Sequence, residues 1–418
     1  MITLEEARRL MMRAVSRAGS EMVHIGEALG RVAASDITAP YNLPAESRSR
    51  LDGYALRSAE TAAASDDQPV RIRLNAQTVS AGRVPTTRQE PGTCTRVMTG
   101  AVLPAGSDAV LAQEQAGLEG DHLVVTRPVR PASGLVEEGA DALAGDVLAA
   151  DGEVLTPTRL ALAAAFGIDR VPVTIRPRVA LLSTGDEVME PGSPPKKGIS
   201  YSNNRHLLAW LTEMQGGIPV HLGVSGDDPA EIAGHLDCAE ADLVVTTGGT
   251  GRGDRDFVQE VWERLEVRKV FEGVLISPGR GTLGGLKEGR PFLALPGSPW
   301  GGRVIFEELI KPLLWRLQGF SCRWPVTIRA MLKKRVDNRA GSCRVLTGDL
   351  ELKEMTTTFS PSERKGVGTF EQVRSRFGYM ILETHMLEMT AGSEVDVRLF
   401  DLPMLAAAVL GNGGKAGR

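Results

Sequence analysis

The sequence predicts a multidomain protein with an α/β domain built on a parallel sheet, a small inserted β-rich domain, a helical N-terminal segment and a C-terminal β domain. Length is the first reason, because 418 residues, of which 42% are hydrophobic, are enough for several cores. The second is that short apolar runs, such as Val179 to Leu182 and Leu243 to Val245, alternate with helical patterns. The third is that the regions on both sides alternate apolar and polar residues, as half-buried strands do.

The composition argues against several classes of protein. The formal net charge is −4, with 48 lysines and arginines against 52 aspartates and glutamates, which leaves no basic field for nucleic acid. No long apolar run occurs and no apolar leader follows Met1, so the sequence predicts no membrane segment and a cytoplasmic location. The 4 cysteines are scattered and the 6 histidines show no metal-ligand spacing, which favours a reduced chain without a zinc site.

Residues 1–40 and 140–170 are predicted to form a helical or linker domain. A helix is expected from Leu4 to Val15, where apolar residues have helical spacing after a capping box. A second short helix is expected from Ile25 to Val32. After the insertion the chain returns with a helix from Thr156 to Phe166.

Residues 41–139 are predicted to form the inserted β-rich domain. Short alternating runs lie between turns there, and Gly117 to Asp121 has the composition of a hairpin turn. The expected strands contain Arg71 to Leu74, Arg96 to Met98, Ala109 to Leu111 and His122 to Val125.

Residues 171–320 are predicted to form the α/β domain, in which strands and helices alternate and imply right-handed crossovers. Ser202 is a cap before one helix, and Asp228 with Pro229 begins another. The other expected elements are strands from Val270 to Ile276 and from Phe292 to Leu295, and helices from Phe257 to Leu265 and from Val304 to Leu317.

Residues 321–404 are predicted to form the C-terminal β domain. Apolar and polar residues alternate there in four runs, which are Val326 to Leu332, Cys343 to Leu350, Tyr379 to Leu382 and Glu394 to Phe400. Residues 405–418 end in a glycine-rich tail that has nothing to bury, so we expect them to be disordered.

Two similar stretches mark the expected functional site. Ser183-Thr-Gly-Asp-Glu187 follows one apolar run, and Thr246-Thr-Gly-Gly-Thr-Gly-Arg-Gly-Asp254 follows the other. Ligands of open α/β sheets bind at the carboxyl ends of strands, and the glycines let backbone N–H groups approach an anion. Carboxylates beside an anion cradle suggest a bridging cation such as Mg²⁺. The sequence therefore predicts a phosphate site with Asp186, Glu187, Asp254 and Asp256 at its rim.

Each of these motifs also has a simpler explanation. A strand–helix turn alone would also use the glycines after Thr246, but their density and the neighbouring hydroxyls favour a phosphate site. Gly279-Arg-Gly-Thr-Leu-Gly284 matches G-x-G-x-x-G, yet a strand rather than a helix is expected after it, so we reject a dinucleotide site and keep Arg280 as a phosphate ligand. Asp228-Pro229 is an ordinary helix start, which leaves Asp227 as the functional candidate.

A series of short motifs runs along the chain from about Thr3 to Phe400. They are L-D-G-Y-A (Leu51 to Ala55), V-M-T-G-A (Val97 to Ala101), L-P-A-G-S-D-A-V (Leu103 to Val110), L-S-T-G-D-E-V (Leu182 to Val188), D-D-P (Asp227 to Pro229), G-D-R-D-F (Gly253 to Phe257) and L-P-G-S-P (Leu295 to Pro299). In this order they resemble the molybdopterin molybdenumtransferase family, which is called MoeA in bacteria and corresponds to the E domain of gephyrin.

The resemblance implies an elongated homodimer in which each subunit has a helical piece, an inserted β domain, a molybdopterin-binding (MogA-like) α/β domain and a C-terminal β barrel. It implies insertion of molybdate into adenylylated molybdopterin, with Mg²⁺ and release of AMP, to give molybdenum cofactor. The active site would lie between the α/β domain of one subunit and the inserted domain of the other. The implied protein partners are a molybdopterin adenylyltransferase and proteins that accept the cofactor.

The motifs and the resemblance together give the candidate site residues. Catalytic roles are expected for Asp52, Thr99, Glu187, Asp256 and Arg280. Substrate binding is expected for Arg48, Thr184, Gly185, Asp227, Thr247, Gly248, Gly249, Thr250, Gly251, Ser277, Pro296 and Pro299. Metal binding is expected for Asp141, Asp186, Glu187 and Asp254.

The chain departs from the family pattern at several charged positions. S-R-S-R-L-D-G-Y from Ser47 stands where the family has D-N-S-A-M-D-G-Y, which adds Arg48 and Arg50. Where the family has K-P-G-K-P, this chain has Ser277-Pro-Gly-Arg-Gly281, and where the family has an aspartate it has Tyr201. We hypothesise that Arg48 and Arg50 replace, from the partner subunit, the positive charge lost at Ser277.

Two further functions stay open at this point. One is a non-catalytic relative that binds molybdopterin or the cofactor as a carrier or scaffold. The other is a molybdopterin adenylyltransferase, because T-G-G-T-G from Thr247 resembles the glycine loop of those enzymes more than the S-G-G-V-S of MoeA. The choice between molybdate and tungstate is also open.

Overall fold

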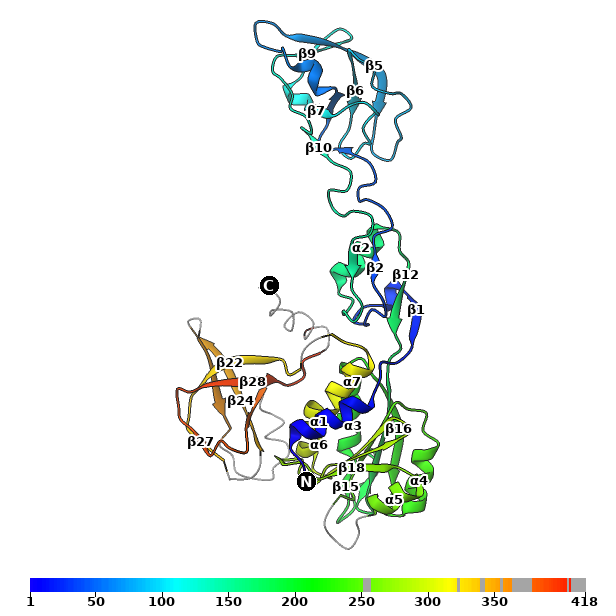
Figure 1. Ribbon diagram of the computed structural model, residues 1–418, viewed down its shortest axis with the longest axis vertical. Coiled ribbons are helices and arrows are strands. Elements are labelled where there is room, and N and C mark those ends of the chain that lie inside the picture. Colours follow the sequence, from blue (N-terminus) through cyan, green and yellow to red (C-terminus); the bar gives the residue numbers. More distant parts are fainter. Residues whose placement is uncertain are drawn as a thin grey trace. The chain divides into compact units, whose positions relative to one another are not determined.

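The structure is a computed structural model that describes residues 1–250, 257–321, 324–338, 343–353, 356–362, 378–403 and 406. The chain divides into two compact units (Figure 1). Unit 1 contains Met1–Ser35, Ala150–Leu160 and Arg170–Arg418, and unit 2 contains Asp36–Ala149 and Ala161–Asp169. Within the described ranges, no helix is long and apolar enough to cross a membrane. The predicted tail 405–418 lies outside the described residues, apart from Ala406.

A six-stranded mixed sheet forms the centre of unit 1. Its strands, in spatial order, are β16 (Ile218–Ser225), β13 (Arg178–Thr184), β17 (Leu243–Thr247), β21 (Arg290–Leu295), β20 (Leu283–Lys287) and β18 (Arg268–Glu272). The first four are parallel, as predicted, whereas β20 and β18 are antiparallel to their neighbours. The predicted parallel sheet is thus confirmed for four strands, and two antiparallel strands extend it at one edge. The cause is a two-residue hairpin turn, Glu288-Gly289, in which both residues have positive φ, as such turns require.

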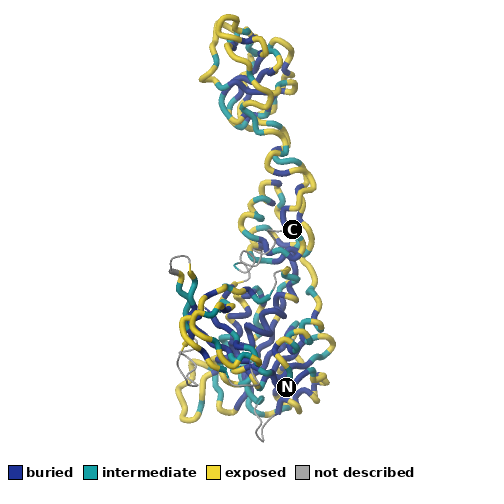
Figure 2. Tube along the Cα trace, turned by 60° about the vertical axis from the view of Figure 1, so that its left-hand side comes forward, coloured by how far each residue is buried: buried dark blue, intermediate teal, exposed yellow. Residues whose placement is uncertain are grey.

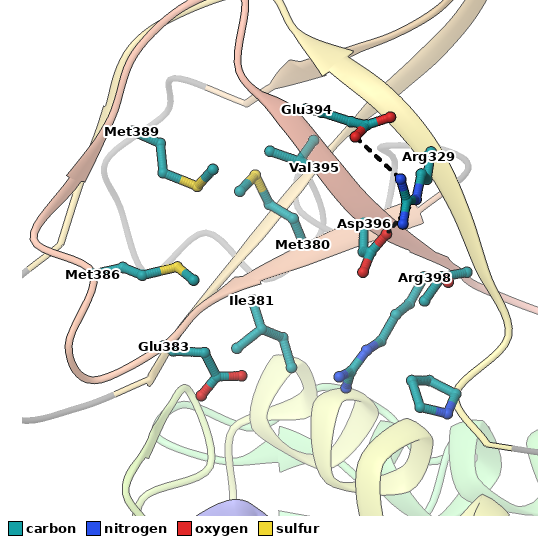
Figure 3. Close-up of a pocket in the computed structure, with 12 residues that line it drawn as sticks. Arg329, Met380, Ile381, Glu383, Met386, Met389, Glu394, Val395, Asp396 and Arg398 are labelled. Atoms are coloured by element: carbon teal, nitrogen blue, oxygen red, sulfur yellow. Dashed lines mark hydrogen bonds and ion pairs between the residues drawn. The ribbon is translucent and has the colours of Figure 1, made fainter.

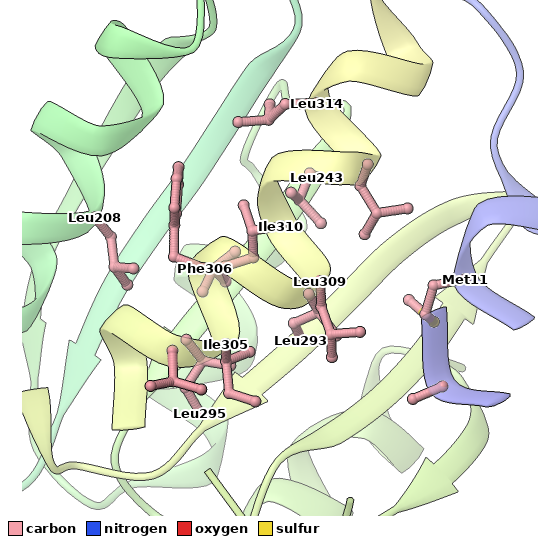
Figure 4. Close-up of a cluster of buried hydrophobic side chains, with 14 of the residues drawn as sticks. Met11, Leu208, Leu243, Leu293, Leu295, Ile305, Phe306, Leu309, Ile310 and Leu314 are labelled. Carbon is pink, nitrogen blue, oxygen red and sulfur yellow. The ribbon is translucent and has the colours of Figure 1, made fainter. Parts of the chain in front are cut away.

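Helices cover both faces of this sheet. Successive residues of β13 point to opposite faces, since Val179 and Leu181 belong to one buried cluster and Ala180 and Leu182 to another. Figure 4 shows the first cluster, in which strand residues meet helical residues such as Phe306. The helices on the first face are α1 (Leu4–Ala14), α3 (Asn203–Met214), α6 (Pro299–Ile305), the π-helical turn η4 (Phe306–Ile310) and α7 (Lys311–Leu317). Those on the second face are α4 (Pro229–Asp237) and α5 (Val258–Arg264).

Two helical predictions differ from the structure in extent. The long helix begins at Pro299 rather than Val304, because the Ser298 hydroxyl accepts from the Gly301 N–H at 3.0 Å and caps it. The helix expected from Ile25 to Val32 is only a 3-10 turn, η1 (Ile25–Glu27). The chain then becomes extended, and Val32 forms a β-bridge with Val154.

The other elements of the predicted helical or linker domain are short. Strand β1 (Ser20–His24) pairs antiparallel with β12 (Arg170–Thr174), which does not join the six-stranded sheet. Helix α2 (Pro157–Ala165) confirms the helix predicted from Thr156 to Phe166.

Unit 2 contains a second six-stranded sheet. Its strands, in spatial order, are β7 (Ala109–Ala112), β4 (Gly53–Leu56), β6 (Thr93–Val97), β5 (Val70–Val79), β9 (His122–Val125) and β8 (Gly117–Glu119). All four predicted strands are present, and the predicted hairpin joins β8 to β9. Its core includes Tyr54, Leu56, Ile72 and Leu123. Two small ribbons accompany the sheet, formed by β2 (Ile37–Thr38) with β11 (Val147–Ala149) and β3 (Arg48–Ser49) with β10 (Leu135–Val136). Short helical turns lie at Ser58–Thr61 (η2) and Gln113–Gln115 (η3).

The C-terminal part of unit 1 is a closed five-stranded barrel, which confirms the expected barrel. Its strands are β24 (Cys343–Lys353), β25 (Thr356–Pro361), β22 (Thr327–Leu332), β28 (Glu394–Leu399) and β26 (Gly378–Leu382), and β26 closes the ring on β24. Buried residues line its interior, as they line the sheets (Figure 2). The short strand β19 (Ile276–Ser277) pairs with β24, while β23 (Val336–Asp337) pairs with β27 (Glu388–Met389). The ribbon β14 (Val188–Met189) and β15 (Ser200–Tyr201) belongs to the α/β part.

Candidate functional site

Three loops meet at one edge of the unit 1 sheet. Because β13, β17 and β21 are parallel neighbours, their carboxyl ends lie side by side. The loops that follow them begin at Gly185, Gly248 and Pro296. The predicted residues Thr184, Thr247 and Pro296 thus lie at the same edge.

Buried hydroxyl groups join these strand ends to helix α3. The Ser202 hydroxyl donates to the Ser183 Oγ at 2.8 Å, and the Ser183 Oγ lies 3.2 Å from the Thr247 Oγ1. The Thr184 hydroxyl donates to the Thr247 carbonyl at 3.3 Å. These side chains are buried, and their hydrogen bonds fix the relative positions of β13, β17 and the start of α3.

Two predicted glycines are required by their surroundings. A Cβ at Gly248 would lie 2.3 Å from the Thr184 carbonyl oxygen, and φ at Gly248 is +108°. At Gly249, where φ is +64°, a Cβ would lie 2.4 Å from the Phe257 ring. Only glycine satisfies both constraints, so the backbone here carries no side chain. The Gly248 N–H donates to the Leu295 carbonyl at 3.0 Å, which fixes the loop against the end of β21.

The carboxylates at this edge come from two strands. Asp186 and Glu187, which follow β13, are exposed. The Asp186 Oδ1 accepts from the Asp227 N–H at 3.1 Å, which joins the ends of β13 and β16. Three other predicted residues, Gly251, Asp254 and Asp256, lie outside the described residues. Among the residues that the structure describes, no three histidine, cysteine or acidic side chains are close enough to hold a metal ion by themselves.

The loop around Arg280 lies against the glycine loop. A Cβ at Gly281 would be 3.2 Å from the Thr250 carbonyl oxygen. Arg280 and Ser277 are both exposed. Strand β20 begins at Leu283, so no helix follows the G-x-G-x-x-G match, as predicted when a dinucleotide site was rejected.

Unit 2 holds the other candidate residues. The Asp52 Oδ1 accepts from the Thr99 N–H at 2.7 Å and from the Thr99 hydroxyl at 2.8 Å. These hydrogen bonds, first from the backbone and then from the side chain, lower the pKa of Asp52, and Arg96 lowers it further. Arg48 and Asp141 are exposed. The predicted residues therefore fall into two groups, one in each unit.

Two hollows in unit 1 lie apart from these residues. One, of about 370 Å³, is in the C-terminal barrel, where Met380, Met386 and Met389 line it (Figure 3). At its rim Arg329 pairs with Glu394 at 3.2 Å. The other, of about 550 Å³, lies between α1, β18 and the turn before β21. Neither is lined by a predicted site residue, so the size of a hollow does not locate the functional site.

Two buried residues of the site were missed at the sequence level. Ser202 was interpreted as a helix cap, but its hydroxyl bonds to Ser183 and does not cap α3. Asn204 was not singled out, yet its side chain bonds to the Gly297 carbonyl at 2.7 Å. The sequence signal for both residues is the polar run Ser202-Asn-Asn directly before an apolar helical stripe. Polar residues that are buried beside such a stripe form hydrogen bonds.

The structure is that of an α/β protein whose candidate site lies at the carboxyl ends of parallel strands, and comparison with known proteins identifies its family. Residues 2–167 match the family model described as the MoeA N-terminal region (domain I and II), and residues 180–316 match the probable molybdopterin binding domain.

Full-length relatives agree with this assignment. The chain is 32% identical to molybdopterin molybdenumtransferase 2 of Mycobacterium tuberculosis, over 76% of this chain and 80% of that protein. It is 34% identical to the molybdopterin molybdenumtransferase of Haemophilus influenzae, over 76% and 78%. The crystal structure of the molybdopterin biosynthesis MoeA protein from Pyrococcus horikoshii superimposes with a TM-score of 0.87 at 31% identity, and covers 96% of this chain and 99% of that one. The chain belongs to the molybdopterin molybdenumtransferase (MoeA) family.

Proposed function

We propose that the protein inserts molybdenum from molybdate into adenylylated molybdopterin, with Mg²⁺-dependent release of AMP. The observation that carries the proposal is the meeting of three loops at one sheet edge, with bare glycine backbone at Gly248 and exposed carboxylates at Asp186 and Glu187. Backbone N–H groups suit the phosphates of such a substrate. Membership of a family whose relatives are named molybdopterin molybdenumtransferase supports the choice of substrate.

The donor chemistry of the edge fits Mg²⁺. This ion is typically held by one or two carboxylates together with substrate phosphates and water, so a complete cage of protein ligands is not needed. Asp186 and Glu187 are the described residues of this edge that would hold it. Asp254 and, from unit 2, Asp141 are further ligands predicted from the sequence. When bound, Mg²⁺ would neutralise negative charge on the phosphates of the substrate.

The chain's own groups act by positioning and charge. Cleavage of a phosphoanhydride depends more on orientation and electrostatic stabilisation than on a protein nucleophile. Arg280, beside the glycine loop, is proposed to stabilise the charge of the departing AMP. Asp52, which Thr99 keeps ionised, is proposed to act in trans from unit 2 of a partner subunit. This arrangement requires the homodimer that the family resemblance implies.

The cellular setting follows from the same proposal. We propose a cytoplasmic homodimer that receives substrate from a molybdopterin adenylyltransferase and passes the cofactor to molybdenum enzymes. A carrier without chemistry is the second candidate, and it is favoured by the loss of a basic residue at Ser277, which is exposed where a ligand would contact it.

Release of AMP tests the two candidates. Purified protein would be mixed with adenylylated molybdopterin and Mg²⁺, with and without micromolar molybdate. Molybdate-dependent release of AMP is expected, and release that stops when Mg²⁺ is chelated would support the metal site. Tight binding of the substrate without AMP would favour the carrier.

Arg48 is proposed to help bind molybdate. Its side chain is exposed, as is that of Arg50 two positions further along the chain. We expect Arg48→Ala to raise the molybdate concentration for half-maximal AMP release by about tenfold, because one charge-assisted hydrogen bond to the oxyanion is lost. Arg57→Ala, which removes an exposed arginine of the same unit, is the control. An unchanged molybdate dependence in Arg48→Ala would refute this role.

A further inference from the structure

Asn204 connects the first turn of α3 to the loop after β21. It is only 7% exposed, and its Nδ2 donates to the Gly297 carbonyl oxygen at 2.7 Å, across 93 positions in the sequence. Its Oδ1 is buried and has no hydrogen-bond partner among the described residues. A buried amide oxygen without a partner is costly and uncommon in folded proteins. The side chain is therefore oriented so that its Nδ2 bonds to the Gly297 carbonyl, although this leaves its Oδ1 without a partner within the described ranges.

This hydrogen bond sets the direction of the next N–H group. The peptide bond between Gly297 and Ser298 is trans, so its carbonyl and its N–H point in opposite directions. Because Asn204 holds the Gly297 carbonyl toward α3, the Ser298 N–H points away from α3. Ser298 is exposed, and within the described part of the chain its N–H has no hydrogen-bond acceptor.

The loop after β21 lies beside another loop of the proposed site. A Cβ at Gly297 would lie 4.0 Å from the Gly248 Cα, and the Gly248 N–H donates to the Leu295 carbonyl at 3.0 Å. The Gly297–Ser298 peptide thus borders the glycine loop that follows β17. Pro296 and Pro299 carry no N–H, so Gly297 and Ser298 hold the only amide hydrogens of this four-residue segment.

We infer that Asn204 is a positioning residue, which turns the Ser298 N–H outward as a hydrogen-bond donor to a phosphate oxygen of the bound substrate. The inference rests on the proposed function, because it takes the substrate to carry a diphosphate. An N–H whose direction is fixed before binding loses little entropy when it contacts an anion. The hydrogen bond from Asn204 to the Gly297 carbonyl therefore increases the affinity of the loop for phosphate.

Hydrogen exchange at the loop gives a direct test. Exchange in the segment 296–299, resolved to Gly297 and Ser298 by mass spectrometry, would be measured on the full chain with and without saturating adenylylated molybdopterin. In the unchanged protein the substrate is expected to slow exchange at Ser298 about tenfold or more, as a new hydrogen bond does. The strand ends 184–187 and 247–250 serve as an independent record that substrate is bound.

Variants at two neighbouring asparagines separate positioning from charge. Asn204→Asp keeps the shape but has no N–H to donate, and Asn204→Ala removes the side chain without adding charge. Both are expected to weaken substrate binding about tenfold and to abolish the slowing at Ser298 at saturating substrate, while the strand ends stay protected. Asn203→Asp, which adds the same charge at the exposed preceding position, should keep both within about twofold of the unchanged protein.

The possible failures are distinguishable. Protected strand ends with no slowing at Ser298 in the unchanged protein would overturn the role of Asn204 and leave the proposed function intact. No protection anywhere would overturn the proposed substrate, and this inference with it. Slowing at Ser298 that persists in Asn204→Ala would show that Asn204 only joins α3 to the loop. The measurement on the unchanged protein decides even where a variant does not fold.

Discussion

At the scale of single residues, the site depends on groups whose charge or shape a neighbour fixes. Asp52 is an example, since two hydrogen bonds from Thr99 hold its carboxylate in the ionised form. Gly248 is another, because the Thr184 carbonyl leaves no room for a side chain. In both cases a neighbouring residue decides what the site residue can do.

We expect Thr99→Val to raise the pKa of Asp52, because the hydrogen bond from the hydroxyl to the charged form is lost while the one from the backbone N–H remains. A ¹³C NMR titration of the aspartate carboxyl groups would measure it, with Ser107→Ala in the same unit as a control. The lowered pKa means that this carboxylate stabilises the fold above the ordinary aspartate value of about 3.9, and that the contribution disappears as pH falls through the lowered value. An Asp52 pKa that does not change in Thr99→Val would contradict this explanation.

At the scale of elements, one buried ionic cluster joins three parts of unit 1. Glu308, in the π-helical turn η4, is fully buried and accepts hydrogen bonds from the Tyr379 hydroxyl at 2.6 Å and from Arg398, both in the barrel, and from Arg8 in α1. Burial, then Glu308 and Glu307, raises the pKa of Tyr379 well above its ordinary value. The tyrosine therefore stays a neutral donor, and its contribution to stability is present below the unfolded pKa of about 10 and falls as pH rises above it.

Glu308→Gln is expected to destabilise the contact between barrel and α/β part by about 3 kcal/mol or more, because Arg398 and Arg8 lose their counter-charge in a buried place. Hydrogen exchange of β26 and β28 at increasing denaturant would report the local free energy of unfolding. The matched control is Glu394→Gln, whose partner Arg329 is exposed and whose change is expected to stay within about 0.5 kcal/mol. Equal effects of the two substitutions would show that the buried cluster does not hold the barrel.

The elements also show how far the sequence could be interpreted. The strands β13 and β17 were predictable because both of their faces are buried, which leaves an unbroken apolar run. Strand β20 was taken for a loop, because Gly284 and Gly285 carry the usual signal of a turn. In the structure these glycines are needed for packing, since a Cβ at Gly284 would lie 2.2 Å from the Phe271 ring and one at Gly285 would meet Val267 at 2.6 Å.

The candidate site could be predicted only in part from the sequence. The glycines and carboxylates after β13 and β17 follow apolar strands directly, so local sequence reveals them. Asn204 was hidden, because its partner Gly297 is distant in the sequence and its role depends on which way a peptide faces. The order of the strands in the sheet brings Asn204 and Gly297 together, and no local sequence pattern predicts this contact.

At the scale of the whole molecule, we expect molybdenum insertion to persist despite the altered charges of this chain. The candidate residues belong to two units, with Asp52 and Arg48 in one and Glu187 and Arg280 in the other. The family resemblance implies that two subunits combine them. Insertion and release of AMP should then be a single coupled event.

The most direct measurement is the amount of molybdenum in the isolated pterin product relative to AMP released, in the same reaction with limiting adenylylated molybdopterin, Mg²⁺ and excess molybdate. We expect one molybdenum atom per AMP, with neither formed when molybdate is withheld. AMP without molybdenum would mean simple hydrolysis of the adenylate. Bound substrate that yields neither would contradict the proposed enzyme and identify the chain as a carrier.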